Sequence, residues 1–306
     1  MNVASVYASV ILIWSTTPLG IRFSVESLDF VQALAIRMWI SLLICGLLIK
    51  VFSLTFKWSR PAFLGYFAGS VAITGAMLCV YWAALTLPSG LIAVLWGISP
   101  LVISLYSRWL LPNSGLDARR ITSILFAVLG LYIIFAQGID VSGDMVAALL
   151  VLMLGINLHG ISSVMLQHQQ LVKGYSAVHP IVQTTGALLI SAPVYAVLWW
   201  AFSPPLPNDV SAKSMLAIGY LAVFGSVLGF VGYFYLMNRM SAANVSLITL
   251  ITPVLALILG AYLADEKLEL QTLAGTVVIL SALIIYHLQH VRFMLGKILG
   301  YSLNKT

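Results

Sequence analysis

Long apolar segments separated by short polar connectors run along the whole 306-residue chain. A membrane-spanning helix needs about 20 predominantly apolar residues, whereas a transmembrane barrel shows strands of about 10 residues with alternating hydrophobicity. The pattern therefore predicts an all-α integral membrane protein with ten transmembrane helices and no soluble domain. The predicted helices cover residues 3–21, 30–50, 61–85, 90–111, 121–137, 145–167, 177–202, 214–238, 243–264 and 270–288.

Two of the predicted helices carry a proline near the centre, Pro100 in AVLWGISPLVISL and Pro253 in SLITLITPVLALIL. Proline lacks a backbone donor and clashes with the preceding turn, so a helix interior normally excludes it. The carbonyl that it frees at membrane depth must face protein or a water-filled cavity. A packing kink would explain one such proline, but two at related positions favour a pair of hinges beside a cavity.

A shift of 153 residues superimposes the two prolines and also places Tyr81-Trp82 on Phe234-Tyr235. The similarity continues into the next apolar segment, which predicts a repeat of five helices. Because five is odd, the two repeats should insert with opposite topology, an arrangement typical of transporters with a site near the membrane midplane. We expect a first repeat over residues 1–138, a second over 139–290 and a cytoplasmic tail over 291–306.

Charge patterning orients the predicted helices. Only 8% of the residues are charged, against roughly 25% in soluble domains. With the N-terminus inside, eleven of the fifteen lysines and arginines lie in inner loops, and eight of the nine acidic residues lie outside. The positive-inside rule then places both termini in the cytoplasm. This asymmetry accounts for the net charge of +6 without a nucleic-acid partner.

Arg37 is the charged residue that lies well inside a predicted span. A buried arginine costs about 2.5–3.5 kcal/mol on insertion scales, so it should face the bundle interior. One interpretation is a clamp for a substrate carboxylate. The other is structural, with Arg37 bonded to helix-end carbonyls, Glu26 or Asp29.

Other polar groups in the spans suggest a site for solute. GINLHGISS places Asn157 and His159 near the midplane of the sixth span, and histidine titrates near neutral pH. His159 could couple to protons or bind solute, or it could be a neutral, hydrogen-bonded core residue. Gln183 is a weaker candidate. No metal-ligand spacing occurs, and the two cysteines indicate no disulfide framework.

Aromatic rings gather where the repeat predicts a cavity, and they can stack on flat or cationic ligands. Anchoring at the membrane interface is the alternative for rings near helix ends, such as Trp82. The hydroxyls beside the prolines could satisfy freed carbonyls or face solute. The candidate substrate-binding set is Trp14, Thr17, Arg37, Trp82, Trp96, Ser99, Asn157, His159, Gln183, Tyr233, Thr249 and Thr252, with Pro100 and Pro253 as hinges.

These segments resemble the EamA family of the drug/metabolite transporter superfamily. The resemblance lies in YWAALTLPSGLIAVLWGISPLVISL (81–105) and its second-half counterpart at 233–275, with an acidic turn at Asp265-Glu266. WSTTPLG (14–20) and FVQALAIRMWISLLI (30–44) are similar to the first two family helices. LPNSG (111–115) departs from the family pattern, because Asn113 stands where the second half has Glu266, so the two turns are not expected to act symmetrically.

The resemblance implies a bacterial inner-membrane transporter that exports amino acids, related metabolites or aromatic and cationic drugs. No Gly-x-x-x-x-Gly-Lys loop is present, so ATP is not expected to drive it directly. The polar groups within the spans are too few for an enzyme site. A lipid or lipid-linked-sugar flippase of the same fold is the alternative. We expect a small-molecule substrate, contact with the lipid bilayer, no cofactor, no metal, and a monomer or weak homodimer.

Overall fold

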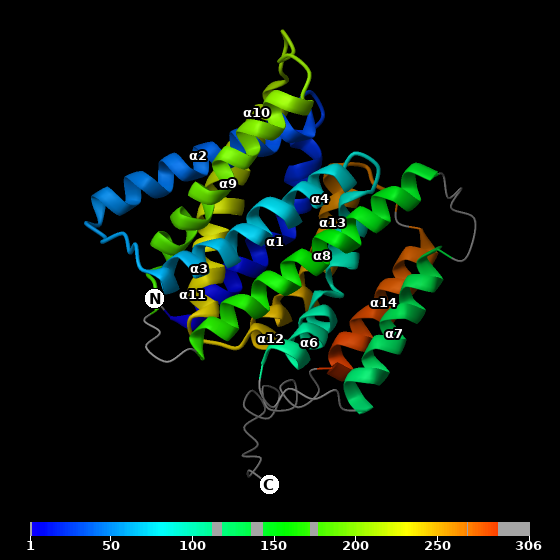
Figure 1. Ribbon diagram of the computed structural model, residues 1–306. Helices are drawn as coiled ribbons and strands as arrows, with labels where there is room; N and C mark the ends of the chain where they lie inside the picture. The colour runs from blue at the N-terminus through cyan, green and yellow to red at the C-terminus, as the bar shows by residue number, and fades with distance from the viewer. Residues whose placement is uncertain (1, 112–117, 136–142, 172–176, 268, 287–306) are drawn as a thin grey trace.

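The computed structural model describes residues 2–111, 118–135, 143–171, 177–267 and 269–286, and every regular element in these ranges is helical. The helices form one bundle (Figure 1). Asn113 and the expected tail 291–306 lie outside the described residues.

The first half of the chain begins with two long helices and continues with shorter pieces. Helix α1 starts after Asn2, whose side chain caps the amide of Ala4, and α2 starts after Asp29, which caps Val31 and Gln32. Polar caps satisfy amides that have no partner within the helix. The elements are α1 (Val3–Ser24), α2 (Phe30–Val51), α3 (Arg60–Ser70), the π-helix η1 (Val71–Ala76), α4 (Met77–Ala83), α5 (Ser89–Trp96), α6 (Ser99–Leu110) and α7 (Ala118–Phe135).

The second half follows the same order of long, interrupted and short helices. Its elements are α8 (Gly143–Gln170), α9 (Pro180–Phe202), α10 (Ala212–Tyr220), the π-helix η2 (Leu221–Leu228), α11 (Gly229–Met237), α12 (Ala242–Val245), the 3-10 helix η3 (Ser246–Leu250), α13 (Thr252–Leu263) and α14 (Leu270–Tyr286). The two π segments therefore fall in the third and eighth predicted spans. Such segments interrupt a helix and are frequent at functional sites.

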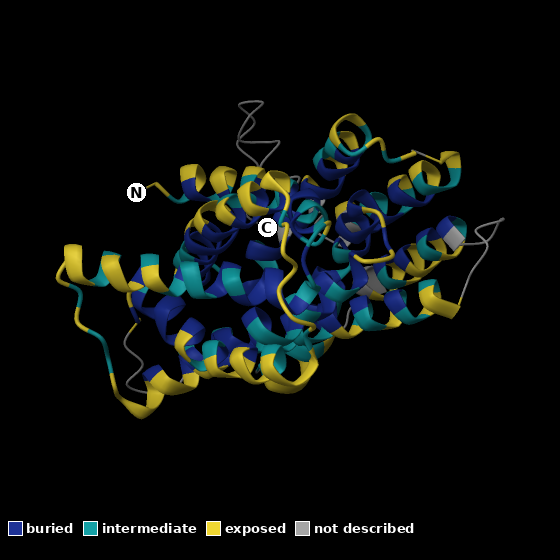
Figure 2. Ribbon diagram, turned by 90° about the horizontal axis from the view of Figure 1, so that it is seen from above, coloured by how far each residue is buried: buried dark blue, intermediate teal, exposed yellow. Residues whose placement is uncertain are grey.

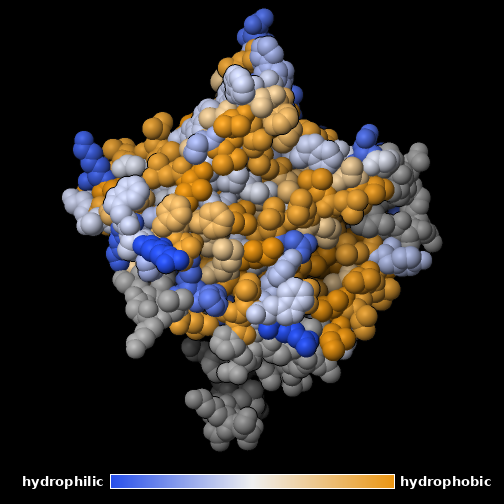
Figure 3. All heavy atoms as spheres, in the orientation of Figure 1, coloured by the Kyte–Doolittle hydropathy of each residue, from blue (hydrophilic) through white to orange (hydrophobic). Residues whose placement is uncertain are grey.

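The described helices fit a multi-pass membrane protein. Seven helical segments are long and apolar enough to cross a membrane, and three shorter apolar helices cover Ile121–Ile134, Thr252–Leu263 and Leu270–Ala282. Apolar side chains cover much of the surface in Figure 3. Exposed residues line the outside of the bundle and buried residues its interior (Figure 2). Lipid tails replace water against such a surface.

The two prolines lie at helix starts, which corrects the expectation of proline inside a continuous helix. Pro100 and Pro253 occupy the first turns of α6 and α13. Helix α5 ends at Trp96, and η3 ends just before α13. Proline is tolerated in the first turn because its missing N–H would have no helical partner there. The fourth and ninth predicted spans are thus each broken near the middle.

Elements at corresponding places in the two predicted repeats pack against each other. Helix α2 contacts α9 and α7 contacts α14, and α5 also packs on α13, the predicted counterpart of α6. The predicted repeat pairs α1 with α8 and α6 with α13. Helix α1 packs on α13, and their counterparts α8 and α6 pack on each other in the same way. Helices α7 and α14 lie side by side at one edge of the bundle (Figure 1). The remaining helices surround the centre, where the broken spans meet α1.

Helices α7 and α14 meet at two glycines. A Cβ built on Gly275 would lie 2.6 Å from the carbonyl oxygen of Gly130, and one on Gly130 would lie 2.8 Å from that of Gly275. Backbone cannot give way as a flexible side chain can. Small residues at such crossings allow the close approach on which membrane helix packing depends.

We predict that Gly275→Ala destabilises the protein by about 1–3 kcal/mol through overpacking. Gly219→Ala is the control, because a Cβ there meets nothing within 4 Å and alanine favours helix by about 1 kcal/mol over glycine. Thermal unfolding in detergent measures both variants. Equal melting temperatures for the two variants would contradict the reciprocal contact.

Candidate functional site

A cavity of about 80 Å³ lies at the centre of the bundle. This volume is the space open to the centres of water-sized molecules, for which one water needs about 10–15 Å³. The space therefore suits several waters or a small solute. It is lined by Trp14, Thr17, Pro18, Ile21, Arg37, Ala72, Met77, Val80, Ile92, Ala93, Trp96, His159, Gly225, Phe230, Thr249 and Thr252.

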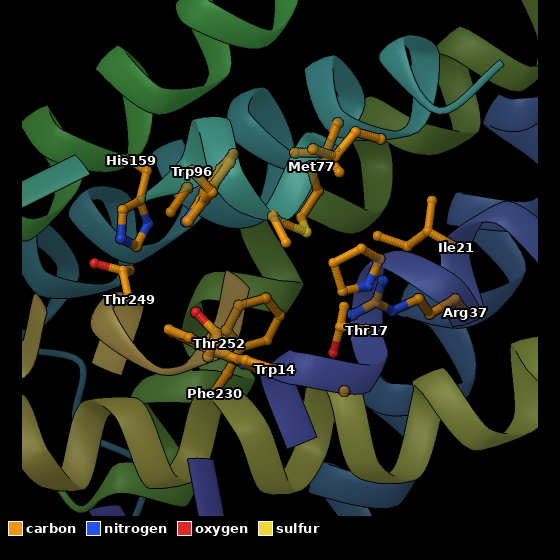
Figure 4. A pocket seen from close by; sticks show the side chains of 16 residues that line it. Trp14, Thr17, Ile21, Arg37, Met77, Trp96, His159, Phe230, Thr249 and Thr252 are labelled. Carbon is orange, nitrogen blue, oxygen red and sulfur yellow. The ribbon is translucent and has the colours of Figure 1, made fainter. Parts of the chain in front are cut away.

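The cavity has two chemically different ends. In Figure 4, His159 and Thr249 lie at one end, while Arg37 and Ile21 lie at the other. The walls between them are mainly apolar. The π-helices border this space through Ala72 and Gly225, so irregular backbone occurs where it faces a cavity, as the membrane setting requires.

Arg37 is a buried cation, with 1% of its surface exposed. Its Nε donates to the Ser226 hydroxyl at 2.8 Å, and one terminal nitrogen donates to the Tyr81 hydroxyl at 3.3 Å. These partners are neutral. Glu26 pairs with Lys213, and Asp29 caps α2, so neither structural partner expected from the sequence neutralises Arg37.

Among the described residues the ion pairs are Arg22–Glu266 and Lys213–Glu26, and neither involves Arg37. A guanidinium carries five N–H donors in a planar fork that matches a carboxylate. Two of these donors are used by hydroxyls, and the group lines the cavity. Its remaining hydrogen-bonding capacity and its uncompensated charge are therefore directed at whatever occupies the cavity.

Aromatic rings surround His159 at the opposite end. The ring centroids of Trp96, Tyr233 and Trp14 lie 5.4, 5.8 and 6.5 Å from that of the imidazole. No described residue makes a hydrogen bond to the imidazole nitrogens of His159, and the ring lines the central cavity. The Tyr233 hydroxyl is paired with Ser163 at 2.8 Å, which leaves its ring as the available surface.

The broken spans bring hydroxyls to the same region. Thr249 and Thr252 line the central cavity beside the start of α13. Ser99 lines a small adjoining cavity of about 10 Å³ together with His159 and Tyr233. The Ser99 hydroxyl is buried and has no hydrogen-bond partner in the part of the chain that the structure describes. Buried polar groups are normally paired, so this hydroxyl is a candidate contact for a bound molecule.

Three residues of the predicted set lie away from the central cavity. Asn157 accepts from the Tyr106 hydroxyl and donates to the Met153 carbonyl, which uses its amide within the protein. Trp82 is half-buried against the hydrophobic core. Gln183 lines a separate, more polar cavity. The other nine candidates border the central cavity or its small neighbour.

Glu266 organises the end of the bundle where α1 ends and α5 begins, here called the Glu266 end. Its carboxylate accepts from Arg22 at 2.7 Å, from the Ser89 amide and hydroxyl at 2.8 and 2.7 Å, and from the Gly90 amide at 3.1 Å. The side chain is 5% exposed. An anion at a helix N-terminus is favoured by the helix dipole, and here it ties α1 and α5 to the turn after α13.

The turn itself aims Glu266 inward. Asp265 adopts a φ of 50°, a left-handed conformation that aspartate tolerates better than most residues, and the Glu266 amide donates to the Gly260 carbonyl. The repeat predicted from the sequence pairs Ser89 with Ala242. The Ala242 amide donates to the neutral Gln167 side chain at 2.9 Å, so the corresponding position in the second half is held by an amide instead of a carboxylate.

An all-helical membrane bundle with interrupted helices around a central cavity is the architecture of a solute transporter. Residues 146–287 match the EamA-like transporter family. The second half of the chain is therefore an EamA-like domain, and the chain is a multi-pass membrane transporter.

Relatives that cover most of the chain carry names of the same kind. One is the uncharacterized inner membrane transporter YedA of Escherichia coli K12, 26% identical over 90% of this chain and 87% of the relative. Protein PagO of Salmonella typhimurium is 23% identical over 86% of this chain and 85% of its own length. One crystal structure shares the fold, with a TM-score of 0.70, 17% identity and coverage of 95% and 98% of the two chains.

We predict that Glu266→Gln loosens the Glu266 end, because an amide loses the ion pair with Arg22 and one acceptor oxygen. A cysteine at Ile21, which lines the cavity, would report the change in a background where Cys45 and Cys79 are alanine. Reaction with a water-soluble maleimide should become severalfold faster.

Glu26→Gln is the matched control, because the Glu26–Lys213 pair has the same 2.7 Å length but is 40% and 51% exposed. Exposed pairs contribute about 0–1 kcal/mol, so this variant should leave the labelling rate unchanged. Equal rates for both variants would show that Glu266 does not hold this end together.

Proposed function

We propose that the protein is a secondary transporter that exports amino acids or related small amphipathic solutes across the bacterial inner membrane. The observation that carries this proposal is Arg37, a buried cation without a carboxylate partner among the described residues, at the end of a largely apolar cavity. Export, as opposed to import, rests on the family resemblance.

The solute would lie along the cavity with its carboxylate at Arg37. Its side chain would then lie against Trp14, Trp96 and Phe230, which border the same space. Charge-assisted bonds to guanidinium are about twice as strong as neutral ones, and burial away from water strengthens them further. Such a site would favour an apolar or aromatic solute with one anionic group over a simple cation, which Arg37 would repel.

The proposed architecture is two inverted five-helix repeats, residues 1–138 and 139–290, with both termini in the cytoplasm. The contacts of α2 with α9 and of α7 with α14 join corresponding helices of the two repeats and support the repeat. The paired π segments and paired helix breaks support it as well. The lysine and arginine asymmetry supports the orientation, which puts the Glu266 end on the periplasmic side.

Alternating access would then rock the halves about this cavity, with Pro100 and Pro253 as hinges. In this interpretation the Glu266 network closes the periplasmic end in the present conformation. Breaking it would require the carboxylate to leave Arg22 and the start of α5.

We predict that Arg37→Gln raises the half-saturating concentration of leucine in liposome counterflow at least tenfold. Arg37→Lys should fall between this variant and the wild type, because an ammonium keeps the charge but not the planar fork. Arg239→Gln is the control, since Arg239 also lies over a tyrosine ring, Tyr235, but is exposed.

Normal counterflow by both Arg37 variants, at wild-type abundance and with unchanged gel-filtration behaviour, would contradict the carboxylate clamp. Loss of counterflow in the Arg239 control as well would indicate general damage. If the wild type exchanged no amino acid but scrambled lipid, the flippase alternative would replace the proposal.

We further predict that the counterflow rate stays flat from pH 5.5 to 8 in the wild type and in His159→Gln. No carboxylate borders the central cavity in the described residues, and the imidazole packs among three aromatic rings. A ring contact to solute needs no proton transfer. A bell-shaped or sloping profile that disappears in His159→Gln would instead assign proton coupling to this residue.

A further inference from the structure

A second cavity of about 250 Å³ lies near the end of the bundle where α2 ends and α3 begins. It is enclosed by residues of α3, α8, α9 and α11 and shares no lining residue with the central cavity. Its walls carry a concentration of side-chain amides. They include Gln169, Gln170 and Gln183, together with Lys57, Gly65 and Phe234. We call this cavity the amide vestibule.

The orientation of two of these amides is fixed by the backbone. Gln183 Nε2 donates to the Gly65 carbonyl at 2.7 Å, and Gln170 Nε2 donates to the Met237 carbonyl at 2.5 Å. A carbonyl only accepts hydrogen bonds, so the nitrogen of each amide must face it, and the amide oxygen is left as an acceptor. No donor from the described residues reaches either oxygen.

Two glutamine amides converge beside Gly65. A Cβ built there would lie 3.0 Å from Gln183 Oε1 and 3.1 Å from the amide of Gln169. The missing side chain of Gly65 thus leaves a space bordered by the fixed acceptor of Gln183 and by an amide that makes no hydrogen bond to the described residues. Gln183 is 6% exposed, so bulk water does not screen its oxygen well. An acceptor in such a place is stabilised when a donor lies beside it.

The ligand chemistry follows from this arrangement. The fixed amide oxygens of Gln170 and Gln183, which both line the vestibule, select a group rich in N–H or O–H donors, and an ammonium provides three. The Gln169 amide can turn its oxygen to the same group. A zwitterionic amino acid carries such an ammonium together with the carboxylate that the central cavity is proposed to bind.

We propose that the amide vestibule is a second solute site, which holds the ammonium group of a zwitterionic amino acid before or after its passage through the central cavity. This inference rests on the proposed function, because it takes the transported solute to be an amino acid. The two sites recognise opposite ends of the same molecule, the ammonium at Gln169 and Gln183 and the carboxylate at Arg37.

Closely packed side chains of α11 separate the two sites. Phe234 borders the vestibule, while its neighbour Tyr233 borders the small cavity next to Trp14 and His159. A Cβ on Gly69 would lie 3.0 Å from the Phe234 ring and 3.1 Å from Ala187. A solute leaving the vestibule for the centre would therefore have to displace the rings of α11.

Equilibrium binding of tritiated leucine to the detergent-solubilised full chain tests the proposal, with 4-methylpentanoate as the analogue without the ammonium. Wild type should bind two leucines, of which 4-methylpentanoate displaces one. Gln169→Leu and Gln183→Leu should each weaken one leucine site at least tenfold and leave the site that 4-methylpentanoate shares. Gln169 makes no hydrogen bond to the described residues, so its loss should not impair folding.

Gln32→Leu is the matched control. Gln32 is also buried, its Nε2 donates to the Pro204 carbonyl, and its oxygen has no partner among the described residues, but it lines neither cavity. This variant should keep both sites. A single leucine site that Arg37→Gln abolishes would overturn the vestibule and leave the proposed function standing. Two leucine sites that survive both vestibule variants, or no saturable leucine binding, would also overturn it.

Discussion

The structure depends on one constraint, that polar groups at membrane depth must find their partners inside the protein. The constraint explains why the interruptions of the helices just before Pro100 and Pro253 face the interior. The two π segments face the interior for the same reason. It also explains the position of Arg37, whose charge could not face lipid. The protein satisfies Arg37 only in part, through two hydroxyls. What remains of its charge defines the chemistry of the cavity.

The two ends of the bundle are held by different residues. The helix starts at Ser89 and Ala242, which the proposed repeat pairs, are held by a carboxylate in one case and by an amide in the other. The charged network at Glu266 fastens three segments, whereas the other end retains a roomier and more polar cavity. In the proposed alternating-access mechanism this difference would give the two ends unequal stability, and unequal stability sets which conformation predominates.

Much of the fold was predictable, because membrane helices are specified by long apolar runs and little else. The all-helical membrane class and the family agree with the structure and the comparisons. Proline chemistry marked the fourth and ninth spans correctly, but the pattern alone did not show that each breaks into separate helices. The apolar run is the same for a kinked and a broken helix. Within the site, the apolar lining residues Ile21, Met77 and Phe230 gave no signal, because a cavity wall and a packed core have the same composition.

The hydrogen-bond partners of the site residues were harder to predict than which residues line the site. Arg37 was identified by its rarity, but its partners Ser226 and Tyr81 are distant in sequence and chemically ordinary. The glutamines of LQHQQL did form a visible cluster at the end of α8, although only the fold places them beside Gly65.

The central claim is that solute binds in the cavity beside the broken fourth span. Counterflow of amino acids and of aromatic or cationic drugs in liposomes, with wild type and Trp96→Ala, tests it most directly. The account predicts saturable exchange of one solute class that Trp96→Ala abolishes, and exchange that is unaffected by this substitution would contradict it.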